Sequence, residues 1–377
     1  MKIRAVPDNG FSVVSDDLGL IVEQAAEELA QMAGDTLVVV GGGGFVGYYL
    51  VQAALHWNEL GMGPPISVTV YDNWVRGLPG WLSKLGDQTG LRIETLDVTT
   101  PLPPGIGPFQ WIVHAASIAS PTYYRRHPIE TMDANVNGLR NLLDYAIGQQ
   151  RRGSPVKGLL FFSTSEIYGD PPPDQIPTPE TYRGHVSCTG PRACYDESKR
   201  YGETLCVNFA RVHGLPVKMV RPFNNYGPGL KLDDGRVIPD FARDIVAGDD
   251  IQMLSSGSPT RTFCYIADAV VGYFKVLVRG RPGEPYNIGS EAPEVSVIDL
   301  ADRMVAIARH RIGYSGSVVR AVSDDPEYLT DNPNRRRPDL AKARDELGYE
   351  PVVDLDEGLA RSLLWYRDLG REDRGAN

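Results

Sequence analysis

Tyr195 and Lys199 are the residues of this chain whose types and spacing point most directly to chemistry. They lie four positions apart in the run Gly190–Arg200, so a helix would place both side chains on one face. A lysine ammonium beside a phenol favours the phenolate, which could then act as a base near neutral pH although the reference pKa of tyrosine is about 10. Such a base can take the proton of an alcohol while a hydride leaves the same carbon. This chemistry requires a redox cofactor.

A glycine-rich turn near the start of the chain supplies a candidate cofactor site. The apolar run Thr36–Val40 leads into a glycine-rich turn and then into a helical pattern that reaches about Asn58. A buried parallel strand, a glycine turn and a helix form the first unit of a dinucleotide-binding fold. Gly41, Gly44 and Gly47 would allow the tight turn, the approach of a pyrophosphate and the close packing of helix on strand. The spacing is G-x-x-G-x-x-G instead of the common G-x-G-x-x-G, and a flexible connection is the alternative interpretation.

The second strand favours the dinucleotide interpretation. The apolar run Ser67–Tyr71 ends in Asp72. A carboxylate at this position can accept hydrogen bonds from the adenosine ribose hydroxyls and would repel a 2′-phosphate. The sequence therefore predicts NAD, not NADP, as the cofactor.

Strands and helices alternate along most of the chain. Strands are expected near residues 91–96, 111–114 and 159–162, and helices near 129–147 and 195–213. This alternation predicts an α/β fold, a Rossmann-like doubly wound parallel sheet. From Arg221 onward Gly, Pro and Asp become frequent, which predicts a smaller substrate-binding lobe over the carboxyl ends of the strands.

These patterns divide the chain into three parts. We expect an amino-terminal extension at 1–34, an NAD-binding domain at 35–220 plus 262–290, and the substrate-binding lobe at 221–261 plus 291–370. Residues 18–32 of the extension carry apolar side chains at helical intervals among acids. An amphipathic helix packed on the domain is therefore expected, because targeting segments are usually poor in acids.

Bulk composition excludes several classes of function. A net charge of −10 and an isoelectric point near 5.2 in 377 residues argue against a general nucleic-acid or membrane-surface role. No apolar run has the length of a membrane-spanning helix, and no signal-type apolar core follows the first residues. The four cysteines show no Cys-x-x-Cys pairing and no histidine at zinc-ligand spacing. A cytoplasmic protein with reduced thiols and no metal site is expected.

Beyond these patterns, the chain resembles a known family from about Thr36 to about Arg367. It is similar to the extended short-chain dehydrogenase/reductases that act on nucleotide sugars, and among them to the UDP-glucuronate decarboxylases. The features shared with the whole superfamily are the glycine turn, Asp97–Val98, His114–Ala116, Asn135, Ser163–Ser165, Tyr195 and Lys199. The more specific motifs are Thr164–Pro171, Gly190–Glu197, Asp233–Val237, Thr260–Tyr265 and Arg336–Asp339.

The resemblance implies a set of site residues. The implied catalytic residues are Tyr195, Lys199, Thr164, Ser165, Glu166 and Arg336. The cofactor-binding residues are Gly41, Gly44, Phe45, Val46, Gly47, Asp72, Asn73, Asp97, Val98, Ala115, Ala116, Asn135, Tyr195 and Lys199. The substrate-binding residues are Tyr124, Arg192, Asn224, Arg236, Arg261, Tyr265 and Arg336.

The resemblance also implies roles for these residues. Tyr195 would be the base, and Lys199 would lower its pKa while holding the nicotinamide ribose. Thr164 would bind the sugar 4-hydroxyl, and Glu166 and Arg336 would lie at the sugar carboxylate. The product would be UDP-xylose, made through a 4-keto intermediate that some relatives release. The arginines of the substrate set suit a diphosphate, whose oxygens a guanidinium binds in pairs. A homodimer is implied, joined through the helices near 129–147 and 195–213.

The sequence departs from the decarboxylase pattern in two places and leaves two other functions open. Residues 183–189 read RGHVSCT where decarboxylases usually carry W-G-x-V-N-P-I, and Ile118 replaces a usual proline. A 4-epimerase or 4,6-dehydratase of another nucleotide sugar is the nearest alternative, although epimerases usually lack the acid at position 166. A non-catalytic NAD-binding regulatory protein is the alternative from another class, although such proteins commonly lose the tyrosine or the lysine.

Overall fold

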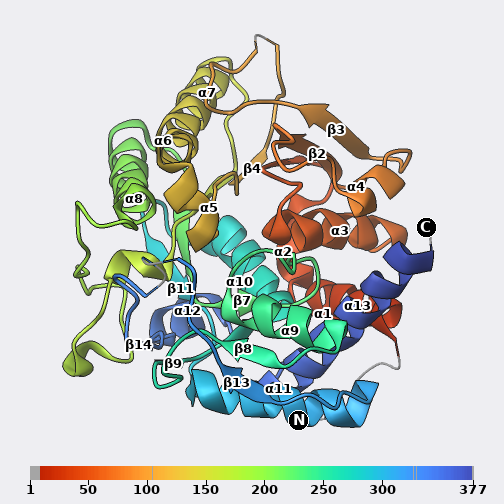
Figure 1. The fold of residues 1–377 in the computed structure, drawn as a ribbon. Helices are drawn as coiled ribbons and strands as arrows, with labels where there is room; N and C mark the ends of the chain where they lie inside the picture. Colours follow the sequence, from red (N-terminus) through yellow and green to blue (C-terminus); the bar gives the residue numbers. More distant parts are fainter. Residues whose placement is uncertain (1–8, 104, 326, 328, 376–377) are drawn as a thin grey trace.

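The computed structural model describes residues 9–375 apart from residues 104, 326 and 328. Its centre is a parallel sheet of seven strands in the order β3-β2-β1-β4-β5-β6-β11 (Figure 1). The strands are β1 (Thr36–Val40), β2 (Ser67–Asp72), β3 (Leu91–Thr95), β4 (Trp111–His114), β5 (Gly158–Phe162), β6 (Val217–Pro222) and β11 (Pro285–Ile288). β5 is buried along its whole length, as expected for a strand covered on both faces.

Alternate side chains of the strands enter two separate hydrophobic cores. Leu37 and Val39 pack with helices α3 (Phe45–Glu59) and α10 (Ile266–Arg279). Val38 and Val40 pack on the opposite face with α7 (Leu139–Arg151) and α8 (Ala193–His213). Successive residues of a strand point to opposite faces, so the period of two places helices on both sides of the sheet. The predicted doubly wound fold is confirmed.

The chain changes direction within the sheet beside β1. β1 pairs with β2 on one side and with β4 on the other, so that Val40 lies opposite both Tyr71 and His114. Such a reversal opens a crevice beyond the carboxyl ends of the two neighbouring strands. The glycine turn follows β1 directly and therefore lies at this crevice.

The single helix expected over residues 129–147 consists of three pieces. α6 (Pro128–Asp133) leads into a π-helical turn at Ala134–Gly138 and then into α7. A Cβ atom added at Gly138 would lie 2.8 Å from Cγ1 of Val98, so the turn packs closely on the segment after β3. A π-turn inserts one extra residue into a helix, and apolar periodicity alone did not reveal it.

The later segments form short strands and helices outside the central sheet, and these make up the smaller lobe. Its strands are β7 (Asn225–Tyr226), β8 (Ile251–Met253), β9 (Thr260–Arg261), β10 (Cys264–Tyr265), β12 (Val295–Ser296), β13 (Val318–Arg320) and β14 (Arg335–Arg336). Its helices are α9 (Val237–Ala247), α11 (Val297–Ile312), α12 (Ala341–Leu347) and α13 (Leu355–Gly375). The short helices α4 (Gly80–Lys84) and α5 (Pro121–Arg126) and the 3-10 turns Ser165–Tyr168 and Pro173–Gln175 complete the described elements.

Residues 9–34, the described part of the amino-terminal extension, form two helices in place of the one expected over residues 18–32, and they contribute more than a surface layer. The helices are α1 (Gly10–Gln24) and α2 (Ala26–Met32), and α1 lies against α3 and α13 (Figure 1). Asp17 of α1 is fully buried, and one of its oxygens lies 2.9 Å from Nη1 of Arg361 in α13. The hydroxyls of Tyr49 and Tyr265 donate to its other oxygen over 2.6 and 2.7 Å. The extension therefore joins the sheet layer to the smaller lobe through one buried carboxylate.

Replacing Asp17 with Ala is expected to lower the free energy of unfolding by about 1–3 kcal/mol, because it leaves Nη1 of Arg361 and two tyrosine hydroxyls buried without their acceptor, while Glu357 still pairs with Arg361. Denaturant unfolding followed by circular dichroism measures this loss. Asp16→Ala is the matched control, since Asp16 is an exposed acid on the same helix and surface substitutions usually change stability by less than about 0.5 kcal/mol. Equal stabilities of the two variants would contradict the role given to Asp17.

Candidate active site

A cleft of about 1680 Å³ opens at the carboxyl edge of the sheet. It is lined by the glycine turn, the ends of β2 and β4, residues 162–166, the start of α8 and the smaller lobe. Pockets for a single drug-sized ligand usually hold about 300–1,000 Å³. The cleft therefore has room for two ligands, as a reaction between a dinucleotide and a substrate requires.

The glycine turn has the close contacts that only glycine permits. Gly41 has φ +81°, and a Cβ atom there would lie 2.4 Å from the backbone nitrogen of Ala116 at the end of β4. A Cβ atom at Gly47 would lie 2.2 Å from the carbonyl oxygen of Gly42, so Gly47 packs α3 on the turn instead of lining the cleft. Gly44 precedes α3 without a side-chain cap. The free amides at this helix end suit a pyrophosphate.

The carboxylate of Asp72 is fixed beside this turn. One oxygen accepts from the Gly43 amide over 3.0 Å and the other accepts from the Trp74 amide over 3.0 Å. Two carboxylate oxygens offer about four lone-pair sites, so the group can still accept hydrogen bonds from ribose hydroxyls. The other predicted cofactor residues that line the cleft are Gly41, Gly44, Phe45, Val46, Asn73, Asp97, Val98, Ala115, Ala116, Tyr195 and Lys199.

Asn135 was predicted to bind the cofactor, but the structure places it beneath the site. It lies buried in the π-helical turn and donates from Nδ2 to Oγ of Ser198 over 2.9 Å. Ser198 in turn donates to the carbonyl oxygen of Tyr195. Asn135 therefore fixes the first turn of α8 from below and does not line the cleft.

The predicted acid–base pair is brought together at the start of α8. Nζ of Lys199 donates to the carbonyl oxygen of Phe162 over 2.6 Å and lies 5.6 Å from the centre of the Tyr195 ring. Burial lowers the pKa of Lys199 to about 7. Burial also raises the pKa of Tyr195 to about 12, against a hydrogen bond with Thr164 that lowers it. That Lys199 lowers the pKa of Tyr195 stays a prediction, and burial is the largest influence on this phenol in the structure.

The aromatic ring of Tyr124 forms one wall beside the base. It stacks on the Tyr195 ring at a centroid distance of 5.0 Å and an interplanar angle of 9°. Its hydroxyl is buried and has no hydrogen-bond partner among the described residues. A hydroxyl in this situation is available to a bound ligand.

Glu166 lies between two arginines from distant parts of the chain. Nη2 of Arg336 donates to Oε2 of Glu166 over 2.8 Å, and the Arg192 guanidinium contacts the same oxygen. Burial disfavours the carboxylate, but Arg192 and Arg336 together hold the pKa of Glu166 below its usual range. The Nε atoms of both arginines are buried and have no hydrogen-bond partner among the described residues. The cluster therefore holds donors that a ligand carboxylate could use.

The predicted nucleotide-binding residues form the far wall of the cleft, with one exception. Asn224 donates from Nδ2 to the carbonyl oxygen of Thr262 over 2.8 Å, and Arg236 pairs with the Asp234 carboxylate. Nη1 of Arg261 donates to the carbonyl oxygens of residues 260 and 334 over 2.8 and 3.1 Å. Tyr265 does not reach the cleft, because its hydroxyl is directed to the buried Asp17.

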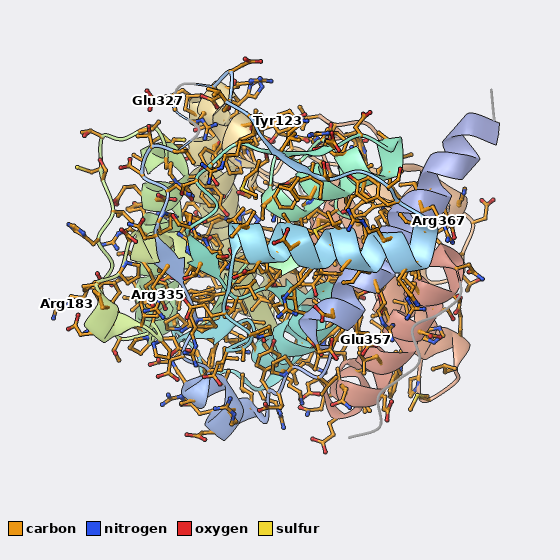
Figure 2. All side chains as sticks on the ribbon, turned by 60° about the horizontal axis from the view of Figure 1, so that its bottom comes forward. Tyr123, Arg183, Glu327, Arg335, Glu357 and Arg367 are labelled. Carbon is orange, nitrogen blue, oxygen red and sulfur yellow. The ribbon has the colours of Figure 1, made fainter. Side chains whose placement is uncertain are left out.

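The two departures from the decarboxylase pattern lie in different surroundings. Ile118 lines the cleft. Residues 183–189, which the structure describes in full, do not line it, and Arg183 points outward at the edge of the molecule (Figure 2). The altered segment therefore lies outside the first layer of residues around the ligands.

Asp196 is a buried acid of the site that sequence reasoning did not single out. It follows Tyr195 directly and lies 4.0 Å from Nε of Arg192. Its position in the run Gly190–Arg200 was visible, since residues 192, 195, 196 and 199 share one face of a helix.

Comparison with known proteins gives consistent results. The model of the NAD dependent epimerase/dehydratase family matches residues 37–289. UDP-glucuronic acid decarboxylase 3 of Arabidopsis thaliana is 36% identical over 323 residues, which are 86% of this chain and 86% of that protein. UDP-glucuronic acid decarboxylase 1 of Xenopus tropicalis is 35% identical over 331 residues, 88% of this chain and 72% of that protein. The structure of a dTDP-glucose 4,6-dehydratase from Streptomyces venezuelae with NAD bound is 26% identical, has a TM-score of 0.75, and covers 90% of this chain and 98% of that chain.

The position of Asp72 predicts that the protein binds NAD about tenfold or more tightly than NADP, because the carboxylate accepts from ribose hydroxyls and repels a 2′-phosphate. Titration calorimetry with both dinucleotides measures the ratio of the dissociation constants. Asp72→Asn should bring the dissociation constants for NAD and NADP closer together, whereas Asp87→Asn, at an exposed acid, should leave their ratio unchanged. Equal affinity of the unmodified protein for the two dinucleotides would refute the assignment.

Proposed function

The chain belongs to the NAD dependent epimerase/dehydratase family, and from that membership we propose that it is a UDP-glucuronate decarboxylase that forms UDP-xylose. The observation that carries the proposal is the buried group of Glu166, Arg192 and Arg336 beside Tyr195. A 4-epimerase or 4,6-dehydratase of a neutral sugar has no need for two arginines at this end of the cleft. An acidic sugar does, because a buried carboxylate requires a charged partner.

The cleft fits NAD through groups that are already placed. The free amides before α3 face the pyrophosphate position, Asp72 faces the ribose position, and Lys199 lies at the inner end. NAD held by these groups would supply a reversible hydride acceptor for C4 of the sugar and a positive charge that lowers the pKa of a nearby phenol.

Tyr195 is the residue that moves the proton of the sugar 4-hydroxyl. It is buried, it lies beside Thr164, and the Tyr124 ring restricts it on one side. Thr164 orients the hydroxyl, and Tyr195 takes its proton as C4 becomes a ketone. The same phenol returns the proton when C4 is reduced again.

The two arginines control the carboxylate. With a ketone at C4, the electrons of the bond between C5 and the carboxylate can flow into an enolate, so the loss of carbon dioxide requires mainly orientation and charge control. Arg336 and Arg192 hold the carboxylate, and Glu166 competes with it for both guanidinium groups. Ser165, buried next to Glu166, completes this end of the site.

The nucleotide lies against the smaller lobe. We assign the diphosphate to Arg236 and Arg261 and the rest of the uridine wall to Asn224. Tyr265 contributes indirectly in this assignment, since it anchors β10 to Asp17. Ile118 in place of proline alters the wall of the cleft but none of these charged contacts.

We further propose that the protein acts in the cytoplasm. No helix in the described part of the chain is both long and apolar enough to span a bilayer. The acidic net charge of −10 does not favour anionic membrane surfaces or nucleic acid.

Arg336→Ala is expected to reduce the release of carbon dioxide from UDP-glucuronate by at least about 30-fold, since truncating one partner of a buried charge pair costs about 2–5 kcal/mol. Affinity for UDP, which has no carboxylate, should change little. Carbon dioxide release and calorimetric binding of UDP are the two measurements, with UDP-xylose or its 4-keto precursor identified by mass. An equal loss of carbon dioxide release and of affinity for UDP would contradict the assignment of Arg336 to the carboxylate.

Two further variants test whether the loss of activity in Arg336→Ala is specific to that residue. Arg335 neighbours Arg336 on β14, pairs with Glu294 and is partly exposed (Figure 2), so Arg335→Ala should leave activity within about twofold. Tyr195→Phe should lower turnover by about 10²–10⁴-fold while UDP-glucuronate still binds. If the unmodified protein releases no carbon dioxide yet converts UDP-galactose, UDP-glucose or a thymidine-linked sugar, the decarboxylase proposal fails.

We also propose a homodimer joined through α6, α7 and α8, which lie together on one side of the molecule (Figure 1). Ile129 and Met132 of α6 are 64% and 43% exposed, and Tyr201 and Val212 of α8 are 51% and 69% exposed. Light scattering should give twice the chain mass of 41.4 kDa. Ile129→Glu should shift the protein toward monomer, whereas Val322→Glu, at a residue exposed elsewhere, should not.

A further inference from the structure

Asp196 is placed to act on Arg192 without entering the cleft. Its side chain is 8% exposed, and its Oδ2 atom lies 4.0 Å from Nε of Arg192, one helical turn earlier on α8. That Nε atom and Oδ1 of Asp196 are buried and find no hydrogen-bond partner in the described part of the chain. Arg192 therefore has two carboxylates within reach, Glu166 on one side and Asp196 on the other.

The charge of this group depends on the protonation of Asp196. Arg192 and Arg336 carry two positive charges, and the pKa of Glu166 is held below its usual range, so Glu166 contributes one negative charge. Burial and the neighbouring Glu166 raise the pKa of Asp196 to about 8, against the pull of Arg192. With Asp196 neutral, Arg192, Arg336 and Glu166 have one surplus positive charge among them, and Arg261, whose pKa burial lowers to about 9, adds to the positive charge around them. Ionisation of Asp196 lowers this positive charge by one.

On the basis of the proposed function, we propose that Asp196 is a positioning residue that sets the affinity for acidic sugars through Arg192. As a neutral acid it leaves the Arg192 guanidinium free to bind the sugar carboxylate. As an anion it draws the guanidinium toward itself and lowers the positive charge of the group by one. Affinity for UDP-glucuronate should therefore fall as the pH rises from 7 to 9.5, while affinity for a neutral UDP-sugar should not change for this reason.

Other charged or titratable groups surround Asp196 and must be separated from it. The groups that face it are Glu166 after β5, Arg336 of β14, Asp331 before β14, Tyr124 of α5, Cys194 and Tyr195 of α8, and Arg192 at the N-cap of α8. Burial raises the pKa of Cys194 and of Tyr124, and it raises the pKa of Tyr195 to about 12. Lys199, whose pKa burial lowers to about 7, lies on the cofactor side and affects acidic and neutral sugars alike.

The experiment measures a ratio in which the contribution of Lys199 cancels. The Michaelis constant for UDP-glucuronate and the inhibition constant for UDP-glucose are determined in the carbon dioxide assay from pH 6.5 to 9.5 with NAD at saturation. In the unmodified enzyme the Michaelis constant for UDP-glucuronate, divided by the inhibition constant for UDP-glucose, should rise by about tenfold or more between pH 6.5 and 9.5. In Asp196→Asn, which mimics the neutral acid, it should stay within about twofold.

Glu197→Gln is the matched control, because Glu197 is the next residue of α8 and its side chain is 40% exposed. In Glu197→Gln the ratio of the two constants should rise with pH as it does in the unmodified enzyme. The proposal is overturned if the ratio of the two constants does not change with pH in the unmodified enzyme, or if it rises equally in Asp196→Asn. The first of these outcomes is measured on the unmodified enzyme alone. If no carbon dioxide is released, the proposed function fails, and calorimetric binding of the two sugars over the same pH range then decides the role of Asp196 separately.

Discussion

Glu166 receives guanidinium groups from two segments that are 144 positions apart in the chain, Arg192 at the start of α8 and Arg336 in β14 of the smaller lobe. Glu166 itself follows β5 of the sheet. These contacts therefore connect the sheet, the catalytic helix and the lobe at the point where the cleft closes. Ion pairs of this kind contribute little net stability, because desolvation of the charges offsets their attraction. Their consequence is specificity: the three segments fit together in the arrangement that pairs these charges.

Desolvation also determines the properties of the acid–base pair. Lys199 is only 2% exposed and Tyr195 is 7% exposed, so burial disfavours both the ammonium and the phenolate. Tyr195 is therefore a neutral phenol at pH 7, whereas Lys199, whose pKa is about 7, is divided between its charged and neutral forms. Lys199 is also a fixed donor to the carbonyl oxygen of Phe162. In the proposed mechanism the strength of Tyr195 as a base would depend on positive charge brought by the cofactor, which would couple proton transfer to cofactor binding.

Much of the fold and the centre of the site could be predicted from the sequence, because their signals are local. β1, the glycine turn and the Tyr195–Lys199 pair depend on residues a few positions apart. The π-turn that buries Asn135, the contact of Tyr265 with Asp17, and the pairing of Arg192 with both Glu166 and Asp196 depend on tertiary packing. Residues 183–189 show the same limit: their departure from the decarboxylase pattern is visible in the sequence, but only the fold places them outside the cleft.

The pairing of Glu166 with the arginines also bears on how the site releases its product. In the proposed assignment, the carboxylate of UDP-glucuronate competes with Glu166 for Arg192 and Arg336, and UDP-xylose has no such group. When carbon dioxide leaves, the two guanidinium groups lose the substrate carboxylate, and Glu166 is the nearest anion that can pair with both. The return of these pairs stabilises the enzyme without the product, whereas the acidic substrate weakens them by sharing the two guanidinium groups. One carboxylate fixed between two arginines can thus favour the exchange of a neutral product for a charged substrate, because leaving a buried guanidinium unpaired is the costly alternative.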